Sequence, residues 1–220
     1  MTTDAISPRF HRILVTGAAG NLAGVLRPGL AAAVPQLRLT DVRGFTAQVA
    51  NEEVVIADLR DLEAAKSVMQ GVDCVIHLAG YPQNAGWEHL RAINIDVTYN
   101  VFEAARQSGV KRVVFASTNR VVSFYPSAQA VHADMPARPD GLYGVTKIFG
   151  ETLGRLYSDQ YGLSVACVRI GAFRPTPEIG RHLSNWVSPA DLLASMLACV
   201  QAQSFRFLVF FAVSGNTRKN

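Results

Sequence analysis

Tyr143 and Lys147 are the residues of this sequence whose types and spacing first suggest a chemical role. They lie four positions apart at the start of an amphipathic run, so a helix places the phenol and the ammonium as neighbours on one face. A free phenol titrates near ~10, and a nearby lysine cation favours its ionised form. We therefore expect Lys147 to lower the pKa of Tyr143 and to make it a base that takes a proton from an alcohol. The same spacing also occurs on solvated helix faces, so the rest of the chain must decide between a catalytic pair and an ordinary exposed face.

A strand, a glycine turn and a helix open the chain and predict a nucleotide site. An apolar strand at residues 12–16 runs into a glycine-rich turn at 17–24 and a helix at 25–34. Glycines let a ligand approach the backbone closely, and the N–H groups at a helix start favour a pyrophosphate. The next strand, 37–40, ends at Asp41, about 20 residues beyond the turn, where a carboxylate accepts both hydroxyls of an adenosine ribose. The predicted cofactor is NAD, although Arg43 leaves room for NADP.

The rest of the chain continues the alternation of strands and helices. We predict strands at 54–57, 74–78, 112–116, 163–169 and 205–213, and helices at 61–69, 87–107, from 143 onward and at 188–201. This alternation predicts one domain over residues 1–220, with a Rossmann-type doubly wound parallel sheet of about seven strands and helices on both faces. The last strand lacks polar alternation, so we expect it to be fully buried. The irregular stretch 171–187 is the predicted substrate lid.

Polar residues at the carboxyl ends of the predicted strands extend the candidate site, because ligands bind at this edge of such sheets. Thr118 follows the strand at 112–116 and is placed to hydrogen-bond a substrate oxygen, with Asn119 and Arg120 in reach of the substrate. The alternative for these residues is an ordinary strand-end turn. His77 lies inside an apolar strand and is interpreted as structural. The amide of Asn94 either braces the cleft or bonds a local carbonyl.

Composition excludes several other classes of protein. The 21 basic and 17 acidic residues give a formal charge of +4 that is spread along the chain, so no nucleic-acid partner is implied. The three cysteines are widely scattered and are interpreted as free thiols in a reducing compartment. No apolar run reaches the ~20 residues that cross a bilayer. We expect a cytoplasmic protein with no membrane partner.

Together the motifs resemble the extended short-chain dehydrogenase/reductase superfamily of the NAD-dependent epimerase/dehydratase type. The resemblance rests on Thr-Gly-Ala-Ala-Gly at 16–20, Asp41, Thr118 and the segment 143–147, and it covers nearly the whole chain. More narrowly, segments 115–119, 136–144 and 168–171, and Arg181 with Trp186, resemble the NAD-dependent uronate dehydrogenases. Those enzymes oxidise the anomeric carbon of glucuronate or galacturonate to an aldarolactone, which implies a small sugar acid as substrate.

The resemblance implies a role for each matching residue. Thr118, Tyr143 and Lys147 are the implied catalytic residues, Asn119 contacts the substrate, and Arg181 holds its carboxylate, with Arg120 or Arg174 as alternatives. The implied cofactor-binding residues are Gly17, Gly20, Asn21, Leu22, Asp41, Asp58, Leu59, Leu78, Ala79, Gly80, Asn94 and Lys147.

The chain departs from the uronate dehydrogenase pattern at several positions. Arg120 stands where that family has histidine, and Pro82 and Ala172 replace two substrate-binding serines. The chain ends at Asn220, so we expect a C-terminal segment that is short relative to the family. Either the chain is truncated, or the pocket wall comes from elsewhere, such as a neighbouring subunit of a homo-oligomer.

Two other functions, an epimerase and a regulatory protein, stay open at this point, and a third, a dehydratase, fits the sequence poorly. A nucleotide-sugar epimerase uses the same Tyr and Lys but needs a large C-terminal lobe to hold its nucleotide. A dehydratase of this superfamily carries an Asp-Glu pair after the threonine, where this chain has Asn119 and Arg120. An NAD-binding regulatory protein with an incomplete pocket is the non-enzyme alternative.

Overall fold

Short apolar strands alternate with helices in the computed structural model, which describes residues 9–177 and 182–216. Within these residues seven strands form one parallel sheet in the order β3-β2-β1-β4-β5-β6-β9. The strands are β1 (Arg12–Thr16), β2 (Gln36–Asp41), β3 (Glu52–Ile56), β4 (Cys74–His77), β5 (Arg112–Thr118), β6 (Ser164–Ile170) and β9 (Phe207–Ala212). The predicted Rossmann-type fold is confirmed, because the chain runs outward from β1 in both directions, as in dinucleotide-binding proteins.

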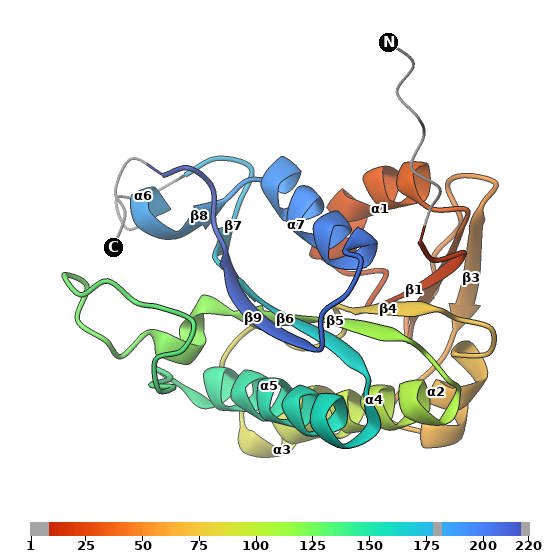
Figure 1. Ribbon diagram of the computed structural model, residues 1–220, viewed down its shortest axis with the longest axis horizontal. Coiled ribbons are helices and arrows are strands. Elements are labelled where there is room, and N and C mark those ends of the chain that lie inside the picture. Colours follow the sequence, from red (N-terminus) through yellow and green to blue (C-terminus); the bar gives the residue numbers. More distant parts are fainter. Residues whose placement is uncertain (1–8, 178–181, 217–220) are drawn as a thin grey trace, which may run out of the picture.

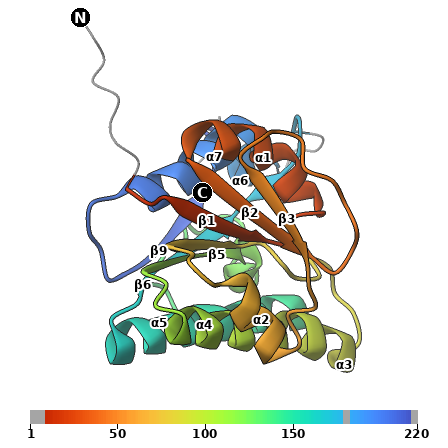
Figure 2. The same cartoon turned by 90° about the vertical axis from the view of Figure 1, so that its right-hand side faces the viewer.

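Helices cover both faces of the sheet. The helices α1 (Asn21–Ala33) and α7 (Pro189–Gln201) lie on one face, and α2 (Leu62–Val68), α3 (Trp87–Leu90), α4 (Val97–Gln107) and α5 (Leu142–Tyr161) lie on the other (Figures 1 and 2). Each face has its own apolar core. Leu26, Leu30, Leu192 and Met196 belong to the first, and Phe102, Phe115 and Tyr157 to the second.

The predicted helix at 87–107 is one continuous rod with a widened turn in its middle. Between α3 and α4 the chain forms a π-helix, η1 (Arg91–Asp96). Such i→i+5 turns are rare and often occur at functional sites. The apolar spacing of the sequence did not reveal it.

The prediction that the last strand is fully buried is wrong. Within the described residues β9 pairs only with β6 and forms an edge of the sheet, and Leu208 is 42% exposed. An apolar run fits a central strand and a half-covered edge strand equally well, so the run alone cannot place the strand within the sheet.

The stretch 171–187, predicted to be irregular, contains regular structure. Its strands β7 (Ala172–Phe173) and β8 (Trp186–Val187) pair in parallel, and α6 (His182–Asn185) precedes β8. In the described ranges no helix has the length and apolar character needed to span a bilayer.

Candidate active site

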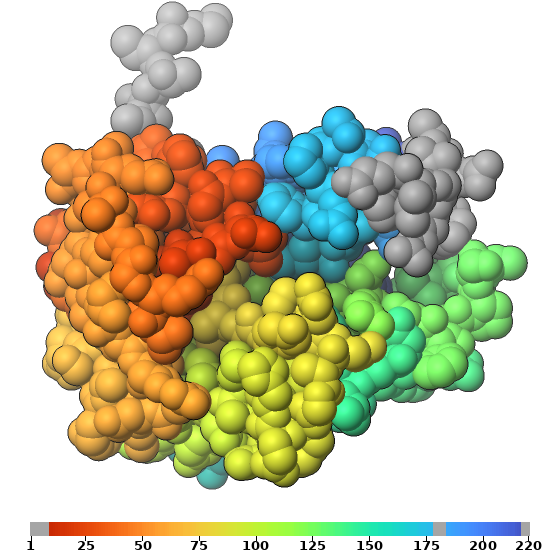
Figure 3. All heavy atoms as spheres, turned by 180° about the vertical axis from the view of Figure 1, so that it is seen from behind, coloured from red at the N-terminus to blue at the C-terminus, as the bar shows by residue number. Residues whose placement is uncertain are grey.

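A cavity of about 1570 Å³ runs along the carboxyl edge of the sheet. Viewed from behind, this face is hollowed between the red-orange N-terminal segments, the yellow segment after β4 and the light-blue residues that follow β6 (Figure 3). The volume exceeds the ~300–1,000 Å³ of pockets for drug-sized ligands, so a dinucleotide and a small substrate fit together. The predicted site residues that line it are Gly17, Gly20, Asn21, Leu22, Asp41, Asp58, Leu59, Leu78, Ala79, Gly80, Thr118, Asn119, Arg120, Tyr143 and Lys147.

The glycine turn after β1 packs directly against the end of β4. Gly17 has a φ of +69°, and a Cβ there would lie 2.7 Å from the Cα of Ala79, so glycine is required on both counts. The hydroxyl of Thr16 accepts a hydrogen bond from the Ala79 amide at 3.2 Å and bonds the buried His77 ring at 2.7 Å. No side chain among the residues that the structure describes caps the first turn of α1, which leaves its N–H groups available to an anion.

Asp41 ends β2 at the far end of the cavity from α5. Its carboxylate accepts hydrogen bonds from the amides of Ala19 at 3.1 Å and Arg43 at 3.0 Å. The Arg43 guanidinium also donates to the carbonyl of Ala19 at 2.7 Å. These bonds hold the carboxylate beside the glycine turn, where a ribose bound along the cavity would meet it.

Asp58 has an arginine neighbour of its own. Arg60 donates to both carboxylate oxygens at 3.0 Å, and this hydrogen bonding holds the pKa of Asp58 below its usual range. The next wall residue, Leu59, is buried. The ends of β2 and β3 therefore each present a carboxylate to the same end of the cavity.

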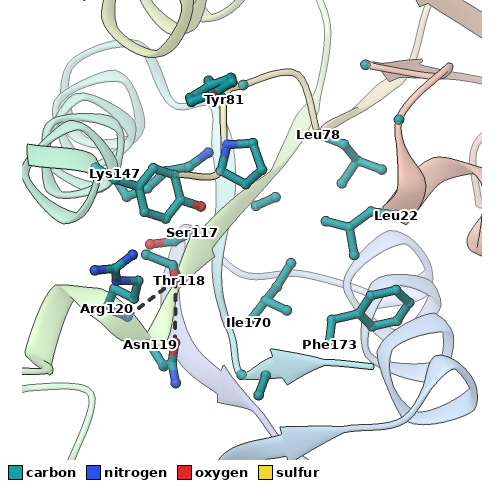
Figure 4. Close-up of a pocket in the computed structure, with 18 of the residues that line it drawn as sticks. Leu22, Leu78, Tyr81, Ser117, Thr118, Asn119, Arg120, Lys147, Ile170 and Phe173 are labelled. Atoms are coloured by element: carbon teal, nitrogen blue, oxygen red, sulfur yellow. Dashed lines mark hydrogen bonds between the residues drawn. The ribbon is translucent and has the colours of Figure 1, made fainter. Parts of the chain in front are cut away.

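Tyr143 and Lys147 lie on one buried face of α5, as their spacing predicts. The two residues are 8% and 5% exposed, and both line the cavity. The Lys147 Nζ lies 5.9 Å from the centre of the Tyr143 ring and 4.9 Å from that of Phe115. Gly80 has a φ of +153°, which residues with a side chain rarely adopt, and a Cβ there would lie 3.2 Å from the Oδ1 of Asn94 and 3.4 Å from the Nζ of Lys147. Lys147 and Thr118 face Leu22 and Leu78 across the pocket (Figure 4).

The expected lowering of the Tyr143 pKa by Lys147 is not found. Burial raises the pKa of Tyr143 to about 12, and the opposing effects come from a hydrogen bond with Thr118 and from the charge of Arg120. Burial also lowers the pKa of Lys147 to about 8. The desolvation of both groups outweighs their proximity, which spacing along a helix does not reveal.

Asn94 braces the cleft from behind and does not line it. It sits in η1, where its Oδ1 accepts from the Tyr81 amide at 2.7 Å and its Nδ2 donates to the Tyr81 carbonyl at 3.1 Å. The same Nδ2 donates to the hydroxyl of Thr146 at 3.0 Å. Of the two alternatives for Asn94, the brace describes these bonds better, since they join the segment after β4 to α5.

A buried charged network, which the sequence did not predict, lies behind Thr118. Glu151 accepts two hydrogen bonds from the Arg169 guanidinium, at 2.9 and 2.8 Å, and one from the Ser117 hydroxyl at 2.5 Å. All three residues are buried. Glu151 lies eight residues after Tyr143, on the same face of α5, and that spacing was the available signal.

The substrate end of the cavity combines predicted and unpredicted residues. Asn119 and Arg120 lie on η2 (Asn119–Val122) at the end of β5, and the Arg120 guanidinium is bound by Asp140. Asp140 and Asn185 also line the cavity, and no role was predicted for either, although Asp140 lies in the segment 136–144 that carries the family resemblance. The carboxamide oxygen of Asn185 is buried with no hydrogen-bond partner among the described residues.

Two of the residues that depart from the uronate dehydrogenase pattern face this end as well. Pro82 and Ala172 line the cavity, so apolar surface stands where the family pattern has hydroxyls. Arg181, the predicted carboxylate-binding residue, lies outside the described residues.

This sheet, the glycine turn and the cleft define a dinucleotide-binding protein of the Rossmann type. Residues 13–199 match the model of the NAD dependent epimerase/dehydratase family, and the chain belongs to that family. The resemblance found in the sequence is confirmed.

Several relatives are similar over most of the chain. A uronate dehydrogenase of Agrobacterium fabrum (strain C58) is 42% identical over 205 residues, which cover 93% of this chain and 77% of the relative. A uronate dehydrogenase of Pseudomonas syringae pv. tomato (strain DC3000) is 38% identical over 208 residues, which cover 94% of this chain and 76% of the relative. A crystal structure of a mutant uronate dehydrogenase from Agrobacterium tumefaciens in complex with NAD has a TM-score of 0.90 at 41% identity, over 93% of this chain and 77% of that chain.

Proposed function

We propose that this protein is an NAD-dependent dehydrogenase that oxidises the anomeric carbon of a hexuronate to an aldarolactone. The observation that carries the proposal is the placement of Thr118, Tyr143 and Lys147 in one cavity with Gly17 and Asp41. The uronate dehydrogenases at about 40% identity support the same substrate class.

The residues of the cavity fit NAD. Asp41 accepts the ribose hydroxyls and repels a 2′-phosphate, while the uncapped start of α1 receives the pyrophosphate. Further along the wall, Leu22 and Leu78 supply apolar surface (Figure 4). When bound, NAD supplies the acceptor for the hydride.

The chain itself supplies the proton chemistry. Thr118 hydrogen-bonds the anomeric hydroxyl and orients it, and Tyr143 takes the proton from that hydroxyl. Lys147 lines the cavity beside the phenol, and its low pKa lets it exchange a proton near neutral pH. Because only the phenolate acts as a base, turnover increases as the pH rises toward the pKa of Tyr143.

At the substrate end, we assign contacts with the sugar to Asn119 and Arg120, and the substrate carboxylate to Arg181. A planar guanidinium binds a carboxylate through two parallel hydrogen bonds, which a lysine cannot do. We further propose that the protein acts in the cytoplasm and that it forms a homo-oligomer. Size-exclusion chromatography with light scattering tests the oligomeric state.

The test uses the purified protein with NAD and a panel of galacturonate, glucuronate, galactose and glucose, followed by NADH absorbance. Substrate-dependent NADH formation is expected with an acid, and Tyr143→Phe should reduce it at least ~10²-fold, the usual contribution of a general base. Tyr161→Phe is the matched control, because Tyr161 lies at the far end of α5 and is 48% exposed. No net NADH with any sugar, or NADH that survives Tyr143→Phe, rejects the proposal.

A further inference from the structure

Arg120 and Asp140 form an ion pair in the wall of the cavity, next to the proposed base. The Arg120 Nε lies 3.0 Å from Asp140 Oδ1, and Nη2 lies 3.0 Å from Oδ2. The two side chains are 33% and 32% exposed, so they are partly shielded from water and still in contact with it. Asp140 lies three residues before Tyr143, and Arg120 lies two residues after Thr118.

The backbone of Arg120 is fixed to the same catalytic residues. Its amide donates to the Thr118 hydroxyl at 3.3 Å. Its carbonyl oxygen would lie 3.0 Å from a Cβ at Gly144, the residue after Tyr143. The end of β5 and the start of α5 are thus joined twice, once by this backbone packing and once by the ion pair, so the guanidinium is held in the wall of the cavity that Tyr143 also lines.

Other charged and titratable groups lie on α5 and on neighbouring elements that pack against it. On α5 itself lies Lys147, whose Nζ is closer to the Phe115 ring than to the Tyr143 ring. From α3 and the segment before it come His89 and Tyr81, whose rings stack edge-on at 4.7 Å.

The remaining groups lie on η1 and on the loop after η2. Arg91 and Asp96 of η1 bind each other and are about half exposed. Tyr125 lines the same cavity. Among all these groups, Arg120 is the one whose charge lowers the pKa of Tyr143.

We propose that Arg120 and Asp140 are a pair of positioning residues that set the charge at the Tyr143 base: Arg120 supplies positive charge to the phenolate, and Asp140 holds the guanidinium in place and offsets part of its charge. The inference rests on the proposed function, in which Tyr143 is the base. It gives this chain an electrostatic aid to the base at the position where the resembling family has histidine.

The two partners should act in opposite directions, and this makes the test sharp. Arg120→Gln removes the cation, so the acid limb of kcat/KM for galacturonate should move up by about one pH unit, the lower end of shifts caused by a close opposite charge. Asp140→Asn removes the offsetting anion, so the same limb should move down. Arg120→Lys keeps the charge and should restore most of the wild-type midpoint.

Arg155→Gln is the matched control. Arg155 lies on the same helix, 12 residues from Tyr143, in an exposed pair with Asp159. Its loss removes one positive charge from the protein without touching the cavity, so the midpoint should stay at the wild-type value.

A measurement that needs no turnover separates this inference from the proposed function. Tyrosine labelled with ¹³C at Cζ reports ionisation by NMR, and the Tyr143 resonance is identified by its loss in Tyr143→Phe. The pKa of Tyr143 measured in this way should follow the same order as the kinetic midpoints. It should be higher in Arg120→Gln than in the wild type, and lower in Asp140→Asn. Midpoints that move together, or do not move in folded variants, overturn the pair's role. Absence of sugar-dependent NADH with the NMR order intact rejects the dehydrogenase assignment instead.

Discussion

Lys147 is a buried cation, and its removal should stabilise the protein while abolishing turnover. The side chain is 5% exposed, and within the described residues it makes no salt bridge. We predict that Lys147→Met, which keeps an unbranched chain of similar length, raises the free energy of unfolding of the ligand-free protein at pH 7. The presence of lysine at this position would then lower the stability of the protein while serving its activity.

The magnitude follows from the change in pKa. Burial lowers the pKa of Lys147 from 10.5 to about 8, and at about 1.36 kcal/mol for each pH unit this costs the folded state roughly 3 kcal/mol. The contact of Nζ with the face of the Phe115 ring returns about 1 kcal/mol. The expected gain is therefore about 2 kcal/mol, or a rise of about 4–8 °C in Tm for a chain of this size.

The dependence on pH distinguishes this cause from better packing. Because the pKa is lower in the folded state, the unfolded chain binds more protons between about pH 8 and 10.5, and the stability of the wild type rises across that window. The difference in the free energy of unfolding between Lys147→Met and wild type should thus have its full value at pH 7 and nearly vanish by pH 10.5. Thermal unfolding followed by circular dichroism measures it, with the exposed Lys111→Met as control. A variant that is less stable at pH 7, or a gap that ignores pH, would refute the reasoning.

Three further predictions follow from the described contacts. Asp41→Asn should weaken NAD binding by about tenfold, through loss of hydrogen bonds to a charged group, with little change for NADP; calorimetry that gives equal losses for both would contradict the ribose assignment. Glu151→Ala leaves the buried Arg169 unpaired and should cost about 3–5 kcal/mol in urea unfolding, of which Glu151→Leu combined with Arg169→Met regains most; a double variant no better than the single one speaks against an unpaired charge. Burial lowers the pKa of His77 to about 3, so stability is lost as the pH falls from 6.5 toward 3, and His77→Gln should flatten the acid-unfolding profile; an unchanged slope argues that other groups drive it.

The fold was largely predictable because its signals are local. Each strand from β1 to β6 is a short apolar run, and the glycine turn and Asp41 fall at the spacing that a nucleotide-binding unit needs. Two features were not predictable for the same reason. The edge position of β9 depends on which strands pair, and the π-helix at 91–96 changes the hydrogen-bond register without changing the apolar pattern.

The candidate site was predictable where helix spacing or strand ends determine a position. Tyr143 and Lys147 share a face of α5, and Thr118 ends β5, as expected. The pKa of Tyr143 was not predictable, because its rise comes from desolvation by several elements that meet only in the folded chain. Asp140 sits in a loop where nothing in the sequence marks it as the partner of Arg120.

The π turn at 91–96 lets the two halves of the continuous helix at 87–107 orient their buried faces independently. In an ordinary helix each residue advances by about 100°, so the orientation of α3 would dictate that of α4. The extra residue of the π turn breaks that link, and Asn94 faces inward while Val97 and Val101 of α4 still bury against the sheet. Removing one residue from this turn would restore regular winding and rotate one half of the rod relative to the other, which would separate the amide from Thr146 or strip α4 from its core.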